Sequence, residues 1–465
     1  MPLDFIASTK GKQKLLLGGF TFIKDRRVNT VTYWKCDQCF NIKCRARVHT
    51  ANDSVVKTLN SHNHAAHAAR IDADRIVNNV KETAISTQDS GHLIVSSAVA
   101  GVQPAVAGQL PTVSTLKRTI RRSRQKATRA LPNPTSLHDL QIPMEFTHMA
   151  GGERFLQFDS GPGNDRILLF CTQKGLQLLQ SSDNWFADGT FKTSPSLFVQ
   201  LYTVHGIQSN KTIPAVFALL PDKRQNTYSR LFEQIKCLIP QVHPKSVLTD
   251  FESAAMTAIS LAFPSASIRG CFFHFAQCIY RQIQTSGLQV QYESDAEFAL
   301  QMRYLSALAF VPTADVVTAF EDLTQRCQYP DDAQPVVDYF EDTWIGRPIR
   351  GSRRRQPLFA HEVWNCYNSV NDNIPKTNNS VEGWHRSFNE MVSCNHPTIW
   401  KFINALKLEQ SRNDLMIEQF IAGRVAPPPK KKYRDCAQRI IQVVSSYNQQ
   451  NLLDYLRGIA HNYNF

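Results

Sequence analysis

The order of apolar segments between residues 184 and 283 constrains the fold of this chain more than any other feature. Three strand-like runs come first, NWFADGTF, LFVQLYTVHGI and TIPAVFALL, and a helical run, TYSRLFEQIKCLI, follows them. A strand SVLTDF, a helix ESAAMTAISLAF, a strand SIRGCFFHF and a helix AQCIYRQIQ complete the series. Because helices alternate with strands only after the third strand, we expect a mixed α/β sheet in which three strands meander before the crossover connections begin.

Segments before and after this series have a different character. Residues 13–35 alternate like two short strands with a turn at Lys24–Arg27, which predicts a hairpin. The run AVAGVQPAVAGQLPTVS has no period and predicts a flexible linker, whereas TLKRTIRRSRQKATRA after it predicts a basic helix. The expected segments are a small β-rich domain at 1–70, a flexible linker with a basic helical segment at 71–150, the first part of an α/β core at 151–283, a helical insertion at 284–375, completion of the core at 376–400 and a C-terminal helical region at 401–465.

Basic residues are concentrated near the N-terminal end of the chain. The 465 residues include 52 Lys and Arg against 39 Asp and Glu, a net charge of +13. Residues 1–70 contain 12 basic and 4 acidic residues, while residues 151–465 contain 31 and 29. A nearly neutral body with a basic arm indicates an acidic partner, most simply nucleic acid, although a solubilising surface gives the same pattern.

Other features of the sequence bear on the cellular compartment. No apolar run approaches the roughly 18 residues that a membrane helix needs, so we expect no membrane-spanning segment and no membrane partner. Eleven Cys, an odd number and mostly scattered singly, indicate reduced thiols in the cytosol or nucleus instead of a disulfide framework. The basic runs KRTIRRSRQK and PPPKKKYR are typical of nuclear-import patches, and we therefore expect nuclear localisation.

A cluster of Cys and His residues lies near the N-terminus. Cys36, Cys39 and Cys44 fall within nine residues, and His62 and His64 follow about twenty residues later. Thiolates and imidazoles are the ligands that suit tetrahedral Zn²⁺, which needs four of these five residues. A domain of about 60 residues with few large apolar side chains also needs a stabilising element such as a bound metal. Chance clustering of Cys and His in a small β domain is the alternative.

The same segment resembles the FLYWCH family of zinc fingers over about residues 7–68. The resemblance rests on four motifs in order, namely Gly19-Phe20-Thr21-Phe22, Tyr33-Trp34-Lys35-Cys36, Cys44-Arg45-Ala46-Arg47 and His62-Asn63-His64. It implies that Cys36, Cys44, His62 and His64 bind a structural Zn²⁺ and that Cys39 stands outside the ligand set.

Several basic side chains are candidates for phosphate contact. Those of the finger are Lys43, Arg45, Arg47 and Lys57, and those of the basic helical segment are Lys117, Arg118, Arg121 and Arg122. For the helical segment, a charged face that only contacts solvent is an equally good interpretation.

Three carboxylates form a second candidate site, in addition to the Cys and His cluster. Asp188 lies in or just after a buried strand, Asp250 ends the apolar run SVLTD, and Glu382 falls in the first turns of a predicted helix. Carboxylates that converge from two strand ends and a helix make a hard-oxygen site for Mg²⁺, and two Mg²⁺ ions can hold the attacking and leaving oxygens of a phosphoryl displacement. Spacing alone does not show that they converge, since a turn Asp or a helix-start Glu is just as good a reading of each one singly.

Residues from about 168 to 400 resemble the transposase domain of Mutator-like elements, the MULE family. The segments that carry the resemblance are FADGTFKTSP, VLTDFESAAMTAI, IRGCFFHFAQCIYRQIQ and TNNSVEGWHRSFN. It implies a ribonuclease H-like core that a helical insertion interrupts before the last acidic helix, with Asp188, Asp250 and Glu382 as the acidic triad. It also implies a DDE-type transposase that binds the ends of its element in double-stranded DNA and cuts and transfers strands with Mg²⁺ or Mn²⁺.

Cys271 and His274 form a Cys-x-x-His motif, which the family also carries. Two ligands do not complete a zinc site, and a packed thiol with an ordinary hydrogen-bonded imidazole at a strand end is the plain interpretation. We prefer a role for His274 in contacting DNA near the carboxylates. The role of the pair stays open.

Two other functions remain compatible with the sequence. One is a catalytically silent, transposase-derived DNA-binding regulator, and the other is a zinc-dependent protein-interaction module. The sequence also leaves open whether the chain forms a homo-oligomer.

Overall fold

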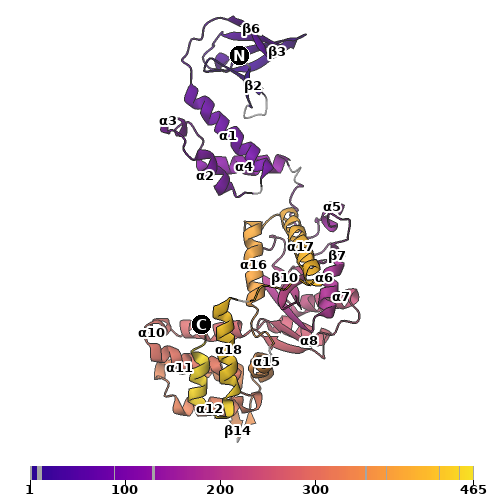
Figure 1. Cartoon of the computed structure of the whole chain (residues 1–465), viewed down its shortest axis with the longest axis vertical. Helices are drawn as coiled ribbons and strands as arrows, with labels where there is room; N and C mark the ends of the chain where they lie inside the picture. Colours follow the sequence, from indigo (N-terminus) through magenta and orange to yellow (C-terminus); the bar gives the residue numbers. More distant parts are fainter. Residues whose placement is uncertain are drawn as a thin grey trace. The chain divides into compact units, whose positions relative to one another are not determined.

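The structure is a computed structural model that describes residues 3–7, 13–87, 89–127, 131–350, 353–372, 374–428, 430–449 and 451–463. The side chains of residues 125–127, 350 and 449 lie outside this description, as does Pro429, so the predicted import patches are described only in part. The chain divides into two compact units at Pro132 and Asn133 (Figure 1). None of the described helices is long and apolar enough to cross a bilayer.

A six-stranded antiparallel sheet forms the first part of the N-terminal unit. Its strands pair in sequence order and are β1 (Asp4–Ala7), β2 (Gln13–Leu17), β3 (Phe20–Val28), β4 (Val31–Cys36), β5 (Arg47–Ala51) and β6 (Ser54–Leu59). The buried side chains that pack on it include Leu15, Phe22, Trp34 and Val48. The predicted turn at Lys24–Arg27 is wrong: these residues continue β3 through a bulge, and the chain turns after Val28, where Asn29 has a φ of 52° that Asn tolerates.

Helices follow the sheet, where we expected a flexible linker. They are α1 (Ala68–Ser86), α2 (Gly91–Val99), α3 (Pro104–Ala107) and α4 (Val113–Ala127). Their shared core consists of Val80, Ala84, Ile94, Val95, Leu116 and Ile120. The linker prediction is wrong for this part because α2 and α3 are too short to give a visible period, and their starts depend on the Ser90 cap and on a first-turn Pro. The basic helix α4 is confirmed.

The C-terminal unit contains the predicted mixed sheet. Its seven strands follow the order β13-β12-β9-β10-β11-β8-β7. They are β7 (Leu156–Asp159), β8 (Leu168–Phe170), β9 (Asn184–Thr190), β10 (Gln200–Gln208), β11 (Lys211–Leu220), β12 (Ser246–Thr249) and β13 (Ser267–Gly270). β9, β10 and β11 form an antiparallel meander, and β12 and β13 then join in parallel, β12 to β9 and β13 to β12. The predicted order of these elements is therefore confirmed, while β7 and β8 were not anticipated.

Helices cover both faces of this sheet. They are α6 (Gln173–Ser181), α7 (Gln225–Leu238), α8 (Ser253–Ala262), α16 (Asn379–Val392) and α17 (Ile399–Ile421), and a short helix, α5 (Met144–Thr147), contacts α17. Helix α9 (Phe272–Thr285) packs instead on the apolar core of the helices that follow it. One face packs Trp185 and Val247 against α7 and α8, while Phe186 and Leu248 point to the other face with Val381 of α16. The expected strand SIRGCFFHF is only partly right, because β13 ends at Gly270 and α9 begins at Phe272.

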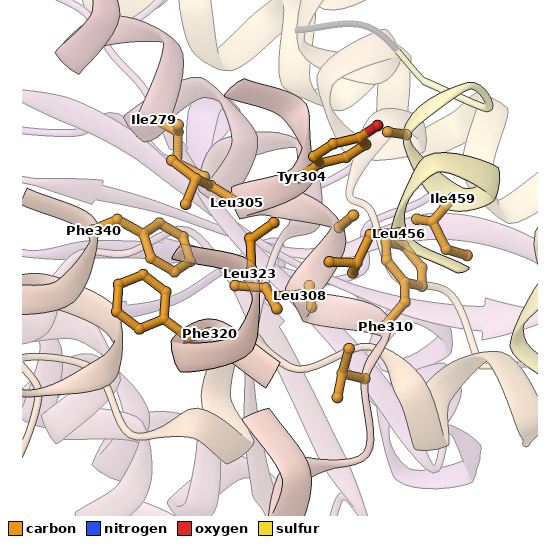
Figure 2. Packing of buried hydrophobic residues seen from close by; sticks show 14 of the residues in the cluster. Ile279, Tyr304, Leu305, Leu308, Phe310, Phe320, Leu323, Phe340, Leu456 and Ile459 are labelled. Atoms are coloured by element: carbon orange, nitrogen blue, oxygen red, sulfur yellow. The ribbon is translucent and has the colours of Figure 1, made fainter. Parts of the chain in front are cut away.

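The remaining helices form a separate apolar core. They are α10 (Gln289–Ser294), α11 (Ala296–Ala307), α12 (Val316–Arg326), α13 (Gln334–Phe340), α14 (His361–Trp364), α15 (Tyr367–Asn371), α18 (Lys431–Ser445) and α19 (Leu452–Ala460), with a small hairpin of β14 (Pro348–Arg350) and β15 (Arg353–Arg354). Figure 2 shows Leu456 and Ile459 of α19 beside Leu308 and Phe310 of the insertion. The C-terminal region that we expected at 401–465 is thus divided, since α17 packs against the sheet side and α19 against the insertion.

Candidate functional site

Four side chains of the N-terminal unit bring their ligand atoms together. The sulfur and nitrogen atoms of Cys36, Cys44, His62 and His64 all lie within 4.8 Å of one another. The Sγ of Cys36 is 3.2 Å from Nε2 of His64, the Sγ of Cys44 is 3.5 Å from Nδ1 of His62, and the two imidazole nitrogens are 3.2 Å apart. Tetrahedral Zn²⁺ with bonds of about 2.0 Å to nitrogen and 2.3 Å to sulfur separates its ligand atoms by about 3.3–3.8 Å, so the donor set and its spacing fit zinc.

The surroundings of these four residues favour metal binding. The backbone carbonyl of Ala65 lies 3.0 Å from Nδ1 of His64, a contact that orients the ring so that Nε2 faces the cluster. The ring of His62 stacks on Phe20 at 3.5 Å, and burial lowers the pKa of His62, which keeps the imidazole neutral and able to bind a cation. Burial raises the pKa of Cys36 to about 11, so a cation is needed to hold it as a thiolate.

The predicted phosphate contacts of this unit divide into exposed and structural residues. Lys43, Arg45 and Lys57 are exposed, as are the four predicted cations of α4. Arg47 is half-buried, and its Nη1 donates hydrogen bonds to the carbonyls of Cys44 and Ala46. Arg47 therefore supports the ligand loop. Cys39 lies outside the ligand group.

In the C-terminal unit, sheet register places two of the three carboxylates side by side. Phe186 of β9 pairs with Leu248 of the parallel strand β12. Asp188 and Asp250 each come two residues later, so both lie on the same face as Phe186 and Leu248, at the carboxyl ends of neighbouring strands about 4.8 Å apart. The turn after Asp250 is fixed because Phe251 packs over Gly270, where an added Cβ would lie 2.2 Å from the Phe251 ring.

Glu382 approaches the same face from helix α16. It lies in the first turn of this helix, which contacts both β9 and β11. Its carboxylate oxygen Oε1 is buried, accepts no hydrogen bond from the residues that the structure describes, and lies 3.4 Å from Nε2 of His274. The negative charges of Asp250 and Glu382 both act on Asp188, which means that the three carboxylates share one region.

Cys271 and His274 connect α9 to this region. The Sγ of Cys271 donates to Oδ1 of Asn378 at 3.0 Å, and Nδ2 of the same Asn378 donates to Oδ2 of Asp188 at 3.3 Å. His274 faces Glu382. The Cys-x-x-His motif therefore contacts two of the predicted acids, one directly and one through Asn378.

The electrostatics of the region are those of crowded negative charge. Burial, and then the charge of Asp250, raises the pKa of Asp188 to about 8. Burial and Glu252 likewise raise the pKa of Asp250. Lys223 opposes both shifts, and its Nζ pairs with Glu252 at 3.1 Å. Like charges in a buried site are relieved either by a proton or by a bound cation.

Two buried histidines lie beside Asp188 and do not neutralise it. Nδ1 of His385 is 3.6 Å from Oδ2 of Asp188, and its Nε2 is 3.2 Å from Oγ1 of Thr203, which also lies 2.9 Å from Nε2 of His205. Burial lowers the pKa of His385 to about 4 and that of His205 well below its ordinary value. Both rings are therefore neutral at neutral pH, and the charge of the carboxylates is left for another cation.

The donor set fits a hard divalent cation. Three carboxylates are the ligands that Mg²⁺ and Mn²⁺ prefer, and Oε1 of Glu382, which lies 3.4 Å from His274 without accepting a hydrogen bond from any described residue, can serve as such a ligand. Within the described part of the chain, the Cys and His cluster is the one group whose ligand atoms all lie within 4.8 Å, so the three carboxylates are more widely spaced than the zinc ligands.

Comparison with known proteins places both regions in families. Residues 5–64 match the model of the FLYWCH zinc finger domain, which ends on the ligand His64. Residues 184–278 match the model of the MULE transposase domain. The chain therefore contains one segment similar to a FLYWCH zinc finger and another similar to a MULE transposase domain. No curated protein matches the chain.

The MULE match begins with β9 and ends within α9, so it includes Asp188, Asp250, Cys271 and His274 but not Glu382. Both family resemblances inferred from sequence are thus confirmed. Sequence reasoning gave Asn378, Lys223 and Thr203 no role in this region. Nothing local marks them, because each reaches the region only through tertiary packing.

Proposed function

We propose that this chain is a Mutator-like DNA transposase that binds the ends of its element and catalyses metal-dependent DNA strand cleavage and strand transfer. The observation that carries the proposal is the approach of Asp188, Asp250 and Glu382 to one face of the sheet within and beside the MULE domain. Three neighbouring carboxylates repel one another and so destabilise the fold, whereas metal-dependent phosphoryl transfer requires such a group.

The order of the central strands supports a ribonuclease H-like core. Along the sheet the third strand of the meander, β11, is followed by β10 and β9 and then by β12 and β13, and among these five strands β10 runs antiparallel to the other four. Such a core places its acids at the ends of the first and fourth strands, which are β9 and β12 here. The helices between β13 and α16 form the insertion, and α16 then returns Glu382 to the sheet.

The residues would divide the chemistry among themselves. Asp188, Asp250 and Glu382 would hold Mg²⁺ or Mn²⁺, which when bound lowers the pKa of water and stabilises charge on the oxygens at phosphorus. Asn378 fixes one oxygen of Asp188, and the neutral His385 and His274 orient the carboxylates without taking their charge. The first in-line displacement would leave a nicked strand with a free 3′-OH, and the second would join that 3′-OH to target DNA.

Affinity for DNA would come from the other unit. The FLYWCH finger and α4 carry exposed cations in a part of the chain with excess positive charge, so they would bind the element ends while the nearly neutral core acts on the strand. Nuclear localisation and assembly into a homo-oligomer belong to the same proposal, the first supported by the basic runs of the sequence and the second open to measurement.

Cleavage of DNA that carries the element ends tests the proposal. With Mg²⁺ or Mn²⁺ the full chain should nick such DNA, and Asp250→Ala should reduce the rate at least about 10²-fold, as loss of one essential electrostatic contact does. Asp183→Asn is the matched control, because Asp183 is an exposed carboxylate that pairs with Lys245 just before β9. If wild type and Asp250→Ala bind DNA equally and neither cuts it, the chain is a silent DNA-binding regulator.

A protein-interaction module is distinguished by salt. A DNA binder loses affinity steeply as salt rises, because bound cations release counterions from the phosphates. A chain that shows no salt-dependent affinity for duplex DNA, while its finger still holds zinc, is not a transposase of the proposed kind.

A further inference from the structure

Two strongly exposed apolar side chains lie together in the loop between the Cys ligands of the finger. The side chain of Phe40 is 72% exposed and that of Ile42 is 45% exposed. Both belong to residues 40–43, which we call the ligand loop tip. Single exposed apolar residues need no explanation, but an aromatic and a branched aliphatic residue two positions apart on one short loop form a surface that invites contact.

Hydrogen bonds fix the ligand loop tip. The backbone N–H groups of Ile42 and Cys44 both donate to the carbonyl of Gln38, at 3.1 and 3.5 Å. Nδ2 of Asn63, which stands between the two His ligands, donates to the carbonyl of Ile42 at 3.1 Å. The apolar side chains are therefore displayed on a rigid support, which reduces the entropy that binding would cost.

The backbone at the end of the tip is strained. Lys43 has a φ of 54°, in the left-handed region that Gly adopts freely and Lys does not. Strain of this kind persists where the surrounding structure imposes it, and it often accompanies a binding role. A Lys at this position keeps a cation beside Ile42 that Gly would lack.

Positive charge surrounds the tip. From Asp37 to Ala51 the sequence has three basic residues and one acidic residue, Asp37, whose carboxylate pairs with Lys14 at 3.3 Å. Lys43 and Arg45 are exposed, and neither forms an ion pair with any described residue. Lys35 places its Nζ 4.9 Å from the ring centre of Phe40 while it pairs with Asp25. An apolar tip with a cationic rim matches duplex DNA, in which base edges lie between rows of phosphates.

We propose that the ligand loop tip is the DNA-reading edge of the finger. Phe40 and Ile42 make apolar contacts with base edges in a groove, of the kind a thymine methyl group offers, and Lys43 and Arg45 contact the phosphates beside them. This inference rests on the proposed DNA binding and adds the surface that reads sequence. Zinc bound to Cys36 and Cys44 would also fix the shape of the tip, because these two residues flank the loop.

Selection from random DNA tests the inference. The full chain is incubated with a pool of duplexes whose central base pairs are randomised, and bound DNA is sequenced and its affinity measured at several salt concentrations. Wild type should enrich one short sequence. Phe40→Ala and Ile42→Ala should weaken binding to that sequence about tenfold each, flatten the preference at one or two positions, and leave the salt dependence unchanged.

The cations should behave differently. Lys43→Ala and Arg45→Ala should weaken binding to selected and scrambled DNA alike and should each reduce the slope of log affinity against log salt by about 1. Val56→Ala is the matched control, because Val56 is 60% exposed on β6 of the same sheet and away from the tip. Zinc content per chain is measured for every variant, so that a lost fold is not read as a lost contact.

The outcomes separate this inference from the function beneath it. If wild type enriches no sequence and binds no duplex, DNA binding itself is refuted. If wild type enriches a sequence and Phe40→Ala and Ile42→Ala enrich the same one with equal affinity, the finger reads DNA elsewhere and only this inference fails. A tip built for a protein partner gives that second result.

Discussion

The thiol of Cys271 lies 3.0 Å from the side-chain carbonyl of Asn378, and both residues are fully buried. The backbone N–H of Asn378 also donates to the same sulfur at 3.4 Å. These two bonds tie the start of α9 to the residue that precedes α16, although 107 positions separate Cys271 and Asn378 in the sequence. Because Asn378 also donates to Asp188, the pair fixes the place where the insertion returns to the sheet.

Replacing Asn378 should therefore affect stability and metal affinity together. Asn378→Ala leaves the thiol of Cys271 without its acceptor and removes a donor from Asp188, and we expect a loss of about 1–3 kcal/mol in the free energy of unfolding. It should also weaken Mn²⁺ binding, measured by calorimetry on the full chain, because Oδ2 of Asp188 and the first turn of α16 are no longer held. Asn395→Ala, an exposed residue just after α16, should change neither quantity.

Cys271 separates a positioning role from a metal-ligand role. Cys271→Ser keeps a donor of similar size at Asn378, so Mn²⁺ affinity should stay close to that of wild type, whereas Cys271→Ala should lower it. A metal-ligand role would make Ser and Ala equally harmful, because a neutral hydroxyl does not replace a thiolate.

The central sheet was predictable because its elements are long and locally consistent. Strands such as β10 and β11 are buried along most of their length, so their long apolar runs can be recognised as strands in the sequence. The short strand β12 was also recognisable, since an Asp at the end of an apolar run is unusual. In contrast, β7 and β8 have four and three residues and give too little pattern to recognise.

Convergence of the acids could not be derived from local sequence. The register of Phe186 with Leu248 decides that Asp188 and Asp250 are neighbours, and register is a property of the folded sheet. The same is true of Asn378, whose partners Cys271 and Asp188 are both far away in the sequence. The Cys and His cluster was predictable because its residue types and spacing indicated a metal site with five candidate ligands, and the family resemblance then selected the four that lie together.

Loss of one zinc ligand should unfold the finger and leave the transposase domain folded. Cys44→Ala removes one of four ligands, and a sheet of this size with a small apolar core depends on the metal for its stability. Hydrogen exchange on the full chain should show β2 to β5 losing protection while β9 to β12 keep theirs. Cys39→Ala is the control from the same loop and should keep both zinc and protection. Equal effects of the two substitutions would remove Cys44 from the ligand set.

Binding of Mn²⁺ to the acidic region should release a proton. The pKa of Asp188 is raised from 3.8 to about 8 in the metal-free chain, so this carboxyl group is mostly protonated between these values and must ionise before it binds a cation. Affinity should therefore rise with pH, by up to tenfold per unit, and level off above about pH 8. Calorimetry in buffers of different ionisation enthalpy should count about one proton near pH 7, and Asp188→Asn should abolish its release. A pH-independent affinity between pH 6 and 8 would contradict the crowding of charge described here.

The exposed basic residues of helix α4 and its hydrogen-bonded Arg124 should respond in opposite ways to substitution. Lys117, Arg118, Arg121 and Arg122 lie on one exposed face at helical spacing and have no ion-pair partner among the described residues, so they repel one another. Arg124 instead donates from Nε to the carbonyl of Ala84 and from Nη2 to those of Thr87 and Asp89, at 2.7–3.0 Å, and so closes the end of α1.

Changing the four exposed cations to Gln should reduce the salt slope of DNA binding by about 3–4 and leave or improve thermal stability, because four phosphate contacts and their mutual repulsion are both removed. Arg124→Gln should lower the stability of the helices by about 1–3 kcal/mol and change the slope little. If the fourfold variant binds DNA with the slope of wild type, α4 is a solvated face and the finger alone supplies the affinity.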